Sequence, residues 1–246
     1  MSERIRLDLA LEQRGLVPSR ARARDAILRG TVTINGVTAH KQNQMVGAAD
    51  KLALSDPAAN YVSRAALKLV AGLDAGAIDP MGKACLDIGA STGGFTQVLM
   101  ERGARRIYAV DEGHDQLHDR LKGSDRVVSM EGVNARDLTA DMIPEPIDLL
   151  VSDVSFVSVT KVLEAPLAPC TPAADAVILF KPQFEVGRRN VGKGGIVTDQ
   201  DAIDTALAEV IAFMTAQGFV HRHSVPSPIS GGDGNVETVL VFQRSA

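Results

Sequence analysis

The sequence has few cysteines and no long apolar segment, and these absences exclude several classes of protein. Only Cys85 and Cys170 occur, too few for a disulfide framework or a cysteine-based zinc site. No apolar run approaches the ~18 residues that a membrane-spanning helix needs. The first residues are charged where a secretory signal would be apolar. We therefore expect a cytoplasmic protein of 246 residues with one large domain, or a large and a small one.

Charge is distributed unevenly along the chain. The net charge is −4, but residues 1–64 carry 10 Lys/Arg against 6 Asp/Glu, and the rest of the chain has a net charge of −8. A basic head on an acidic body is typical of a head that binds a polyanion, although a solvated basic face would give the same imbalance.

The head is expected to be a small α+β domain. The apolar spacing predicts a first helix that stops at Arg14-Gly15, and a second that starts at Ser19 as N-cap and ends at Gly30. Alternating residues around Asn35-Gly36 predict a hairpin, and residues 51–55 a further strand. The stretch 56–60 is a linker candidate, which divides the chain into domains 1–59 and 60–246.

The body alternates strand and helix patterns, which indicates a mostly parallel sheet with crossover helices. We expect an α/β, Rossmann-like fold with an antiparallel pair of strands at one edge. The strand candidates are 84–88, 106–111, 126–130, 147–152, 175–181, 219–225 and 236–243. The helix candidates are 62–72, 95–103, 158–167 and 199–217, the last closed by Gly218.

A glycine-rich turn follows the first strand of the body. Asp87 stands at the end of the apolar run, and the glycines that follow it have the spacing Gly-x-x-x-Gly-Gly. This spacing matches neither a dinucleotide-binding turn nor a Walker loop, and methyl-donor sites are the better match. A purely structural turn is the alternative.

Polar residues also end the next strands, at positions where a nucleoside would bind. Asp111 ends the second strand, where an acid typically bonds ribose hydroxyls, and Asn134 follows the third, near the expected adenine. Such residues also cap helices, so each has a structural alternative. The cofactor-binding candidates are Asp87, Gly89, Ser91, Thr92, Gly93, Gly94, Phe95, Asp111, Asn134 and Asp153.

Two lysines and two acids are expected to meet at the carboxyl edge of the sheet. Asp153 ends the fourth strand and Lys181 the fifth. Partial burial and a neighbouring cation such as Lys68 can lower the pKa of a lysine toward ~7–8, where it acts as a general base. Glu237 would supply a second carboxylate. This set suits deprotonation of a hydroxyl beside a positively charged donor, and a structural ion-pair network is the alternative.

Other sequence patterns are weaker evidence for a functional site. The fourth strand lacks the two prolines of an amino-group methylase, and Pro169-Cys170 stands too late to be a cytosine methylase nucleophile, so we expect a packing cysteine. His114 and His118 have metal-ligand spacing, but a solvated helix face is favoured, and nothing in the sequence requires a metal. The basic loop 187–195 either clamps a phosphate backbone or is disordered.

These motifs together resemble a known family. Residues 5–52, with Arg6-Leu-Asp and Ile34-Asn-Gly, resemble the RNA-binding module of ribosomal protein S-four. Residues 61–243 resemble FtsJ-like ribose methyltransferases. The whole chain resembles the TlyA family, also called haemolysins, through the motifs Ser63–Leu69, Asp87–Thr96, Lys181–Gly187 and Gly234–Glu237.

The resemblance implies S-adenosylmethionine as cofactor, ribosomal RNA as partner and a cytidine 2′-hydroxyl as target. It implies a catalytic Lys-Asp-Lys-Glu tetrad formed by Lys68, Asp153, Lys181 and Glu237. The chain departs from the family at 114–117, which has His-Asp-Gln-Leu in place of Tyr-Gly-Gln-Leu and leaves the contacts of this loop open. The RNA-binding candidates are Arg6, Arg20, Arg24, Arg64, Arg188 and Lys193. A non-catalytic ribosome factor, a membrane-lytic protein and a base methylase are the alternatives.

Overall fold

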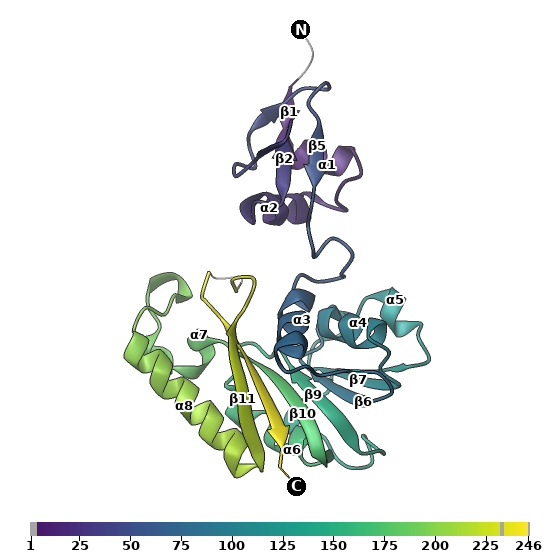
Figure 1. Cartoon of the computed structure of the whole chain (residues 1–246), viewed down its shortest axis with the longest axis vertical. Coiled ribbons are helices and arrows are strands. Elements are labelled where there is room, and N and C mark those ends of the chain that lie inside the picture. The colour runs from purple at the N-terminus through teal and green to yellow at the C-terminus, as the bar shows by residue number, and fades with distance from the viewer. Residues whose placement is uncertain (1–3, 232–233, 246) are drawn as a thin grey trace. The chain divides into compact units, whose positions relative to one another are not determined.

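The computed structural model describes residues 4–231 and 234–245, so the first three residues of the charged start lie outside the described part. The chain forms two compact units, Met1–Asn60 and Tyr61–Ala246 (Figure 1). From residue 4 onward, the N-terminal unit has two helices and five short strands. These are β1 (Ile5–Arg6), α1 (Leu7–Gln13), α2 (Arg20–Leu28), β2 (Val32–Ile34), β3 (Val37–Thr38), β4 (Met45–Val46) and β5 (Leu52–Leu54).

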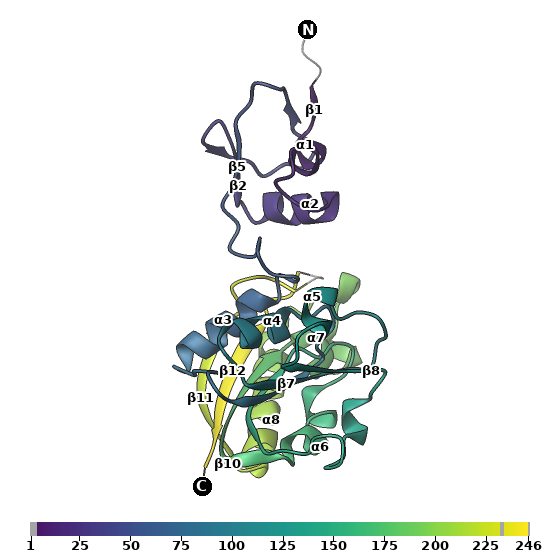
Figure 2. The same cartoon turned by 90° about the vertical axis from the view of Figure 1, so that its right-hand side faces the viewer.

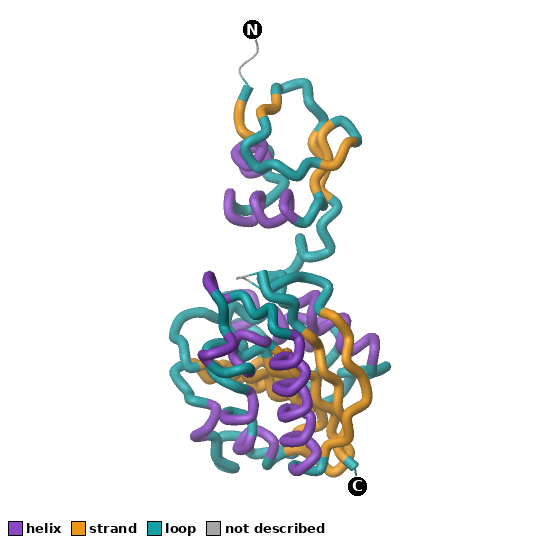
Figure 3. Tube along the Cα trace, turned by 90° about the vertical axis from the view of Figure 1, so that its left-hand side faces the viewer, coloured by secondary structure: helices purple, strands orange, loops and turns teal. Residues whose placement is uncertain are grey.

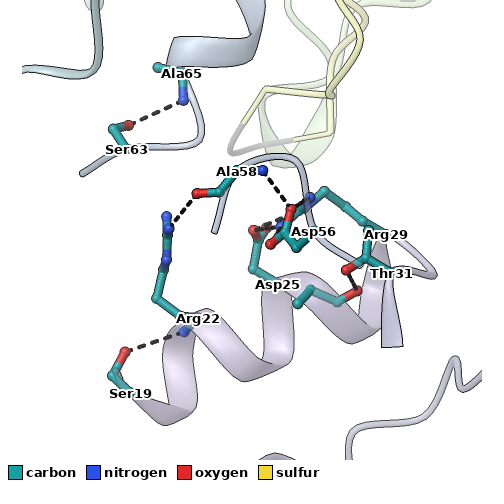
Figure 4. Close-up of polar contacts among 10 residues, drawn as sticks. Ser19, Arg22, Asp25, Arg29, Thr31, Asp56, Ala58, Ser63 and Ala65 are labelled. Carbon is teal, nitrogen blue, oxygen red and sulfur yellow. Dashed lines mark hydrogen bonds and ion pairs between the residues drawn. The ribbon is translucent and has the colours of Figure 1, made fainter. Parts of the chain in front are cut away.

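The expected elements of the head are confirmed. The Ser19 hydroxyl accepts a hydrogen bond from the Arg22 backbone N–H and caps α2 (Figure 4). Asn35 and Gly36 have φ of 52° and 84°, the left-handed pair that a tight two-residue hairpin between β2 and β3 needs. Helices α1 and α2 pack together over a small apolar core formed by residues such as Leu7, Leu11, Ile27 and Val32.

The stretch after β5 is fastened to α2 within the same unit. The Arg29 guanidinium donates to both carboxylate oxygens of Asp56, at 2.7 and 2.6 Å. The Arg22 guanidinium donates to the carbonyl oxygen of Ala58 at 2.9 Å (Figure 4). Residues 56–58, expected to be a linker, are thus held by side chains of the helix.

Among the described residues, the C-terminal unit is built on one seven-stranded sheet with the order β11-β12-β10-β9-β6-β7-β8. Figure 2 labels both edge strands, β11 and β8. The five strands from β10 to β8 are parallel, and β12 runs antiparallel to both β10 and β11. The fold class is therefore confirmed. The strands are β6 (Ala84–Ile88), β7 (Arg106–Asp111), β8 (Val127–Glu131), β9 (Ile147–Ser152), β10 (Cys170–Phe180), β11 (Phe219–Pro226) and β12 (Thr238–Arg244).

Successive residues of the central strands enter two different apolar cores, one on each face of the sheet. Leu86 and Ile88 of β6 belong to the core that helix α8 covers, whereas Cys85 belongs to the core under α3 and α4. Figure 3 shows the sheet with helices packed on it. The helices are α3 (Ala66–Ala75), α4 (Gly94–Glu101), α5 (Asp119–Lys122), α6 (Glu164–Leu167), α7 (Pro182–Glu185) and α8 (Gln200–Ala216). Short 3-10 helices span Ala135–Asp137, Val159–Lys161, Arg188–Asn190 and Lys193–Gly195.

Three expectations about the elements are wrong in detail. Helix α3 starts at Ala66 instead of 62, because Val62 N–H donates to the Gln97 side chain at 2.8 Å and the Ser63 hydroxyl accepts from Ala65 N–H. The helix expected over 158–167 is divided into two short pieces. His114 and His118 do not share a helix face: His118 caps α5, and residues 115–117 between the two histidines are bent, non-helical backbone.

Candidate active site

The two lysines and two acids of the predicted tetrad form a continuous chain of alternating charge at the carboxyl edge of the sheet. The Lys181 Nζ lies 2.7 Å from Asp153 Oδ1, and the Lys68 Nζ lies 3.8 Å from Asp153 Oδ2. On its other side the Lys68 Nζ lies 2.5 Å from Glu237 Oε2. Residues that are far apart in the sequence therefore converge on one spot.

Each of these four charged residues belongs to a different part of the fold. Lys68 lies on α3, Asp153 follows β9, Lys181 follows β10 and Glu237 immediately precedes β12. Because β9, β10 and β12 are neighbours, and β12 runs in the opposite direction, its start meets the ends of the other two. Lys68, Lys181 and Glu237 are buried.

These contacts are close ion pairs, not directed hydrogen bonds: Asp153 Oδ1 and Glu237 Oε2 accept no well-oriented hydrogen bond within the described residues. The Lys181 ammonium does donate a hydrogen bond to Ser155 Oγ at 2.7 Å and one to the Asp153 carbonyl oxygen at 3.3 Å. Charges buried this deeply persist in a fold only when they are paired.

A cavity of about 380 Å³ lies beside Asp153, a member of this ion chain. Its walls combine apolar residues with polar ones, among them Asp111, Asn134 and Asp153. This volume and a mixture of apolar and polar walls suit a small-molecule site. The other lining residues include Ile88, Val110, Val133, Val154, Val157 and Val162.

A second cavity of about 160 Å³ shares Gly89, Ser91, Asp153 and Ser155 with the first. Lys181 lines this second cavity, as do Thr92, Gly94 and Phe95 of the glycine-rich turn. Lys68 and Glu237 line neither cavity. The ion chain therefore has an accessible end, Lys181 and Asp153, and a supporting end behind it.

Gly89 is one residue of the turn at which the geometry leaves no room for a side chain. Its φ is +81°, and a Cβ would lie 3.1–3.2 Å from the backbone of Asp153 and Val154. The ends of β6 and β9 can approach this closely only because no side chain stands between them. Gly93, another cofactor-binding candidate, faces Leu117 and Leu121 and lines neither cavity.

Asp111 lies where the sequence places it, at the end of β7 and on the wall of the larger cavity. Its carboxylate accepts hydrogen bonds from the Ser91 N–H at 2.8 Å and the Gly113 N–H at 2.7 Å. It thus ties the glycine-rich turn to the loop after β7.

The loop at 112–118, where the chain departs from the family, is held by Glu131 at the end of β8. Glu131 Oε1 accepts from the N–H groups of Gln116 and Leu117, at 2.6 and 2.9 Å. Its other oxygen lies 2.8 Å from Lys122 Nζ, and these contacts lower the pKa of Glu131 to about 2. The loop thus keeps a defined shape despite its different residues.

Asp87 is fully buried beneath the glycine-rich turn and lines neither cavity. Its Oδ2 accepts a hydrogen bond from the Thr96 hydroxyl at 2.6 Å, and its Oδ1 has no partner within residues 4–231 and 234–245. Burial raises the pKa of Asp87 to about 7, against the opposing effect of the Thr96 hydrogen bond. A cation bound near the glycine-rich turn would favour the charged form of the Asp87 carboxylate.

The basic loop after Lys181 is anchored to the segment that carries Glu237. The buried Asn235 side chain accepts from the Val197 N–H at 2.9 Å and donates to the Gly195 carbonyl oxygen at 2.8 Å. Arg188 and Lys193, two RNA-binding candidates, are exposed on this loop. Of the other candidates, Arg6, Arg20 and Arg24 are exposed in the N-terminal unit, and Arg64 is half-buried before α3.

The sequence indicates no role for Ser155 or Asn235, although Asn235 stands in the motif Gly234–Glu237. Their hydrogen-bond partners lie 26 to 40 residues away in the sequence, so no local signal marks them. Cys170 packs in the apolar core and belongs to neither cavity, as expected for a packing cysteine. The described residues contain no group of three or more His, Cys, Asp or Glu side chains suited to a metal ion.

None of the helices in the described part of the chain is both long and apolar enough to cross a membrane.

Known proteins match the chain over both of its units. Residues 61–244 match the FtsJ-like methyltransferase family, and residues 5–52 match the S4 domain. The chain is 43% identical to the 16S/23S rRNA (cytidine-2′-O)-methyltransferase TlyA of Mycobacterium tuberculosis, over 98% of this chain and 90% of that protein. It is 39% identical to Hemolysin A of Brachyspira hyodysenteriae, over 97% of this chain and 99% of the relative.

A solved structure from Streptococcus thermophilus that carries the hemolysin name covers 100% of this chain and 90% of its own, with a TM-score of 0.76 at 34% identity. The likeness therefore extends over both units. The chain belongs to the TlyA family, whose members join an S4 domain to an FtsJ-like methyltransferase domain.

Proposed function

We propose that this chain methylates the 2′-hydroxyl of a cytidine in ribosomal RNA, with S-adenosylmethionine as methyl donor. The observation that carries the proposal is the ion chain of Lys181, Asp153, Lys68 and Glu237, in which Lys181 lines the smaller cavity and Asp153 lines both cavities. The M. tuberculosis relative, an rRNA (cytidine-2′-O)-methyltransferase by name and 43% identical over nearly the whole chain, supports this choice of substrate. Ribosomal RNA as substrate places the activity in the cytoplasm.

The residues present fit the cofactor. The larger cavity has a volume that suits an adenosine and both apolar and polar walls, and in this proposal Asp111 binds the ribose hydroxyls and Asn134 lies near the base. The buried Asp87 Oδ1, which has no hydrogen-bond partner among the described residues, precedes the turn that would hold the positively charged end. When bound, S-adenosylmethionine supplies a methyl group activated by a sulfonium centre.

The chain itself must hold the ribose hydroxyl and remove its proton. Lys181 can take this proton only as the neutral amine, so its ammonium first releases a proton to solvent; we assign it this role because it lines the smaller cavity beside Asp153. Asp153 and Ser155 hold that Nζ in place from two sides. The rate then depends on alignment of the hydroxyl with the methyl group at roughly 3–3.5 Å.

Lys68 and Glu237 act as positioning residues in this proposal, because neither lines a cavity. Lys68 holds Asp153 from the side opposite Lys181, and Glu237 neutralises Lys68. The basic side chains of both units, among them Arg20, Arg64 and Arg188, would bind RNA phosphates.

Methyl transfer tests the proposal directly. The chain is incubated with ribosomal subunits and tritiated S-adenosylmethionine, and the RNA is digested and analysed by mass spectrometry. Methyl mass on the ribose of one cytidine is expected, and Lys181→Met should abolish it. Lys161→Met, at an exposed lysine, is the matched control and should leave it unchanged. Methyl mass on a nucleobase would contradict ribose transfer, and no transfer by the unaltered chain would indicate a binding factor.

A further inference from the structure

A buried carboxylate in the N-terminal unit joins two of the arginines expected to bind RNA. Asp8 is 3% exposed, although it lies in the first turn of a helix. Arg6 donates to its two oxygens from Nε and Nη2, each at 2.9 Å. Arg20 Nη2 donates to the same carboxylate at 3.1 Å. One acid thus links the start of α1 to the start of α2.

Both guanidinium groups keep donors free for a ligand. Their side chains are 45% and 53% exposed, whereas that of Asp8 is 5% exposed. A guanidinium has five N–H donors in a rigid plane, and Arg6 uses two of them on Asp8 and Arg20 uses one. Within the described residues, neither group donates to any other acceptor.

Other arginines of the same unit are used differently. Arg14 donates to the backbone carbonyl oxygens of Gly47 and Asp50, and Arg29 to the carboxylate of Asp56. These guanidinium groups hold the fold together. Arg6 and Arg20 differ because one anchor point fixes both while most of their donors stay accessible.

We propose that Asp8 is a positioning residue that fixes Arg6 and Arg20 as a preformed site for RNA phosphates. The inference rests on the proposed function, which supplies RNA as the partner. A guanidinium that is already ordered loses less conformational freedom on binding than a free one, and its planar donors match phosphate oxygens. The negative charge of Asp8 also repels RNA phosphates. Asp8 therefore strengthens RNA binding only if the gain from ordering the two arginines is larger than this repulsion.

This opposition gives a sharp test. The full chain is titrated, without methyl donor, against a labelled RNA hairpin at several salt concentrations. Asp8→Asn should weaken binding about 5- to 10-fold and reduce the slope of log K against log salt by about 1, although it removes a negative charge. The matched control Glu12→Gln removes the same charge from the same helix and should bind as tightly as the unaltered chain, or slightly tighter. Binding by Asp8→Asn that equals that of the control would overturn the inference.

Far-UV circular dichroism would show whether Asp8→Asn folds. If it does not, a second variant still tests the inference. Arg6→Lys combined with Arg20→Lys keeps Asp8 and both positive charges but loses the planar donors, and it should weaken binding by a similar factor. Unchanged binding of this double variant would also overturn the inference.

The two proposals fail in different ways. If the unaltered chain binds RNA and transfers methyl groups while both variants bind normally, only the positioning role of Asp8 is wrong. If the chain binds RNA but transfers nothing, only the proposed catalysis is wrong. If the unaltered chain does not bind RNA, RNA is the wrong partner, and the proposed role of Asp8 in RNA binding is wrong as well.

Discussion

Neutralising Glu237 should make the C-terminal unit easier to unfold, because it leaves the Lys68 ammonium buried without its nearest counter-ion. The two side chains are 3% and 8% exposed, and their charged atoms lie 2.5 Å apart. Removing one partner of a buried pair costs about 3–5 kcal/mol. Because Asp153 still lies 3.8 Å from Lys68, the cost of Glu237→Gln should be near the lower limit, about 3 kcal/mol.

A double-mutant cycle separates the pairing from other effects. Lys68→Met alone leaves the Glu237 carboxylate unpaired and should also destabilise the fold. The double variant removes both charges, so its cost should be smaller than the sum of the two single costs by about 2 kcal/mol. Lys83→Met is a suitable control, because its ion pair with Asp175 is more exposed and should contribute less than about 1 kcal/mol.

Urea unfolding followed by far-UV circular dichroism is the appropriate assay, since the chain has no tryptophan and only two tyrosines. The two compact units can unfold in separate steps, so the transition that shifts must be assigned before free energies are compared. Additive costs in the cycle would refute the reasoning, because they would show that Lys68 and Glu237 do not interact in solution. Both single variants should also lose methyl transfer.

Three further outcomes are expected. Gly89→Ala should weaken S-adenosylmethionine binding more than 10-fold in calorimetry, since its Cβ would press on the Asp153 backbone at a φ of +81°; normal affinity would show that the strand ends can separate. The pKa of Asp8 is lowered to about 2, chiefly by the Arg6 hydrogen bond, so its stabilisation is present above pH ~4 and lost toward pH ~2. Because its partners Arg6 and Arg20 are half exposed to solvent, we expect this stabilisation of the fold to be only about 1 kcal/mol. Thermal melts of Asp8→Asn should not show this loss of stability at low pH. The pKa of Asp87 is raised to about 7, so stability should fall between pH ~4 and ~7, and melts of Asp87→Asn should show no such slope.

The sequence was sufficient for the elements whose pattern is local. Strand β6 is an unbroken buried run bounded by a turn, and its predicted limits, 84–88, are those of the structure. The convergence of Asp153 and Lys181 was also predictable, because parallel neighbouring strands end at the same edge of a sheet. Helix α3 was placed too early because its start is set by Gln97, a residue 35 positions away that holds Val62 outside the helix.

Side chains whose partners are distant in sequence were not predictable in the same way. Asn235 stands within the motif Gly234–Glu237, but only the fold shows that its side-chain amide forms hydrogen bonds with Gly195 and Val197 of the basic loop. Ser155 likewise gains its contact with Lys181 only when β9 and β10 lie side by side. A periodic pattern shows which residues are buried, but it does not show which polar group each of them meets.

The position of β12 has a consequence for the order in which the enzyme is assembled. This strand follows every other strand in the sequence, yet it is inserted between β10 and β11, and the residue just before it is Glu237. A chain translated only as far as β11 lacks both this strand and the Glu237 carboxylate that neutralises Lys68. If the four residues act together as proposed, methyl transfer begins only after residue 237 has been synthesised and β12 has entered the sheet.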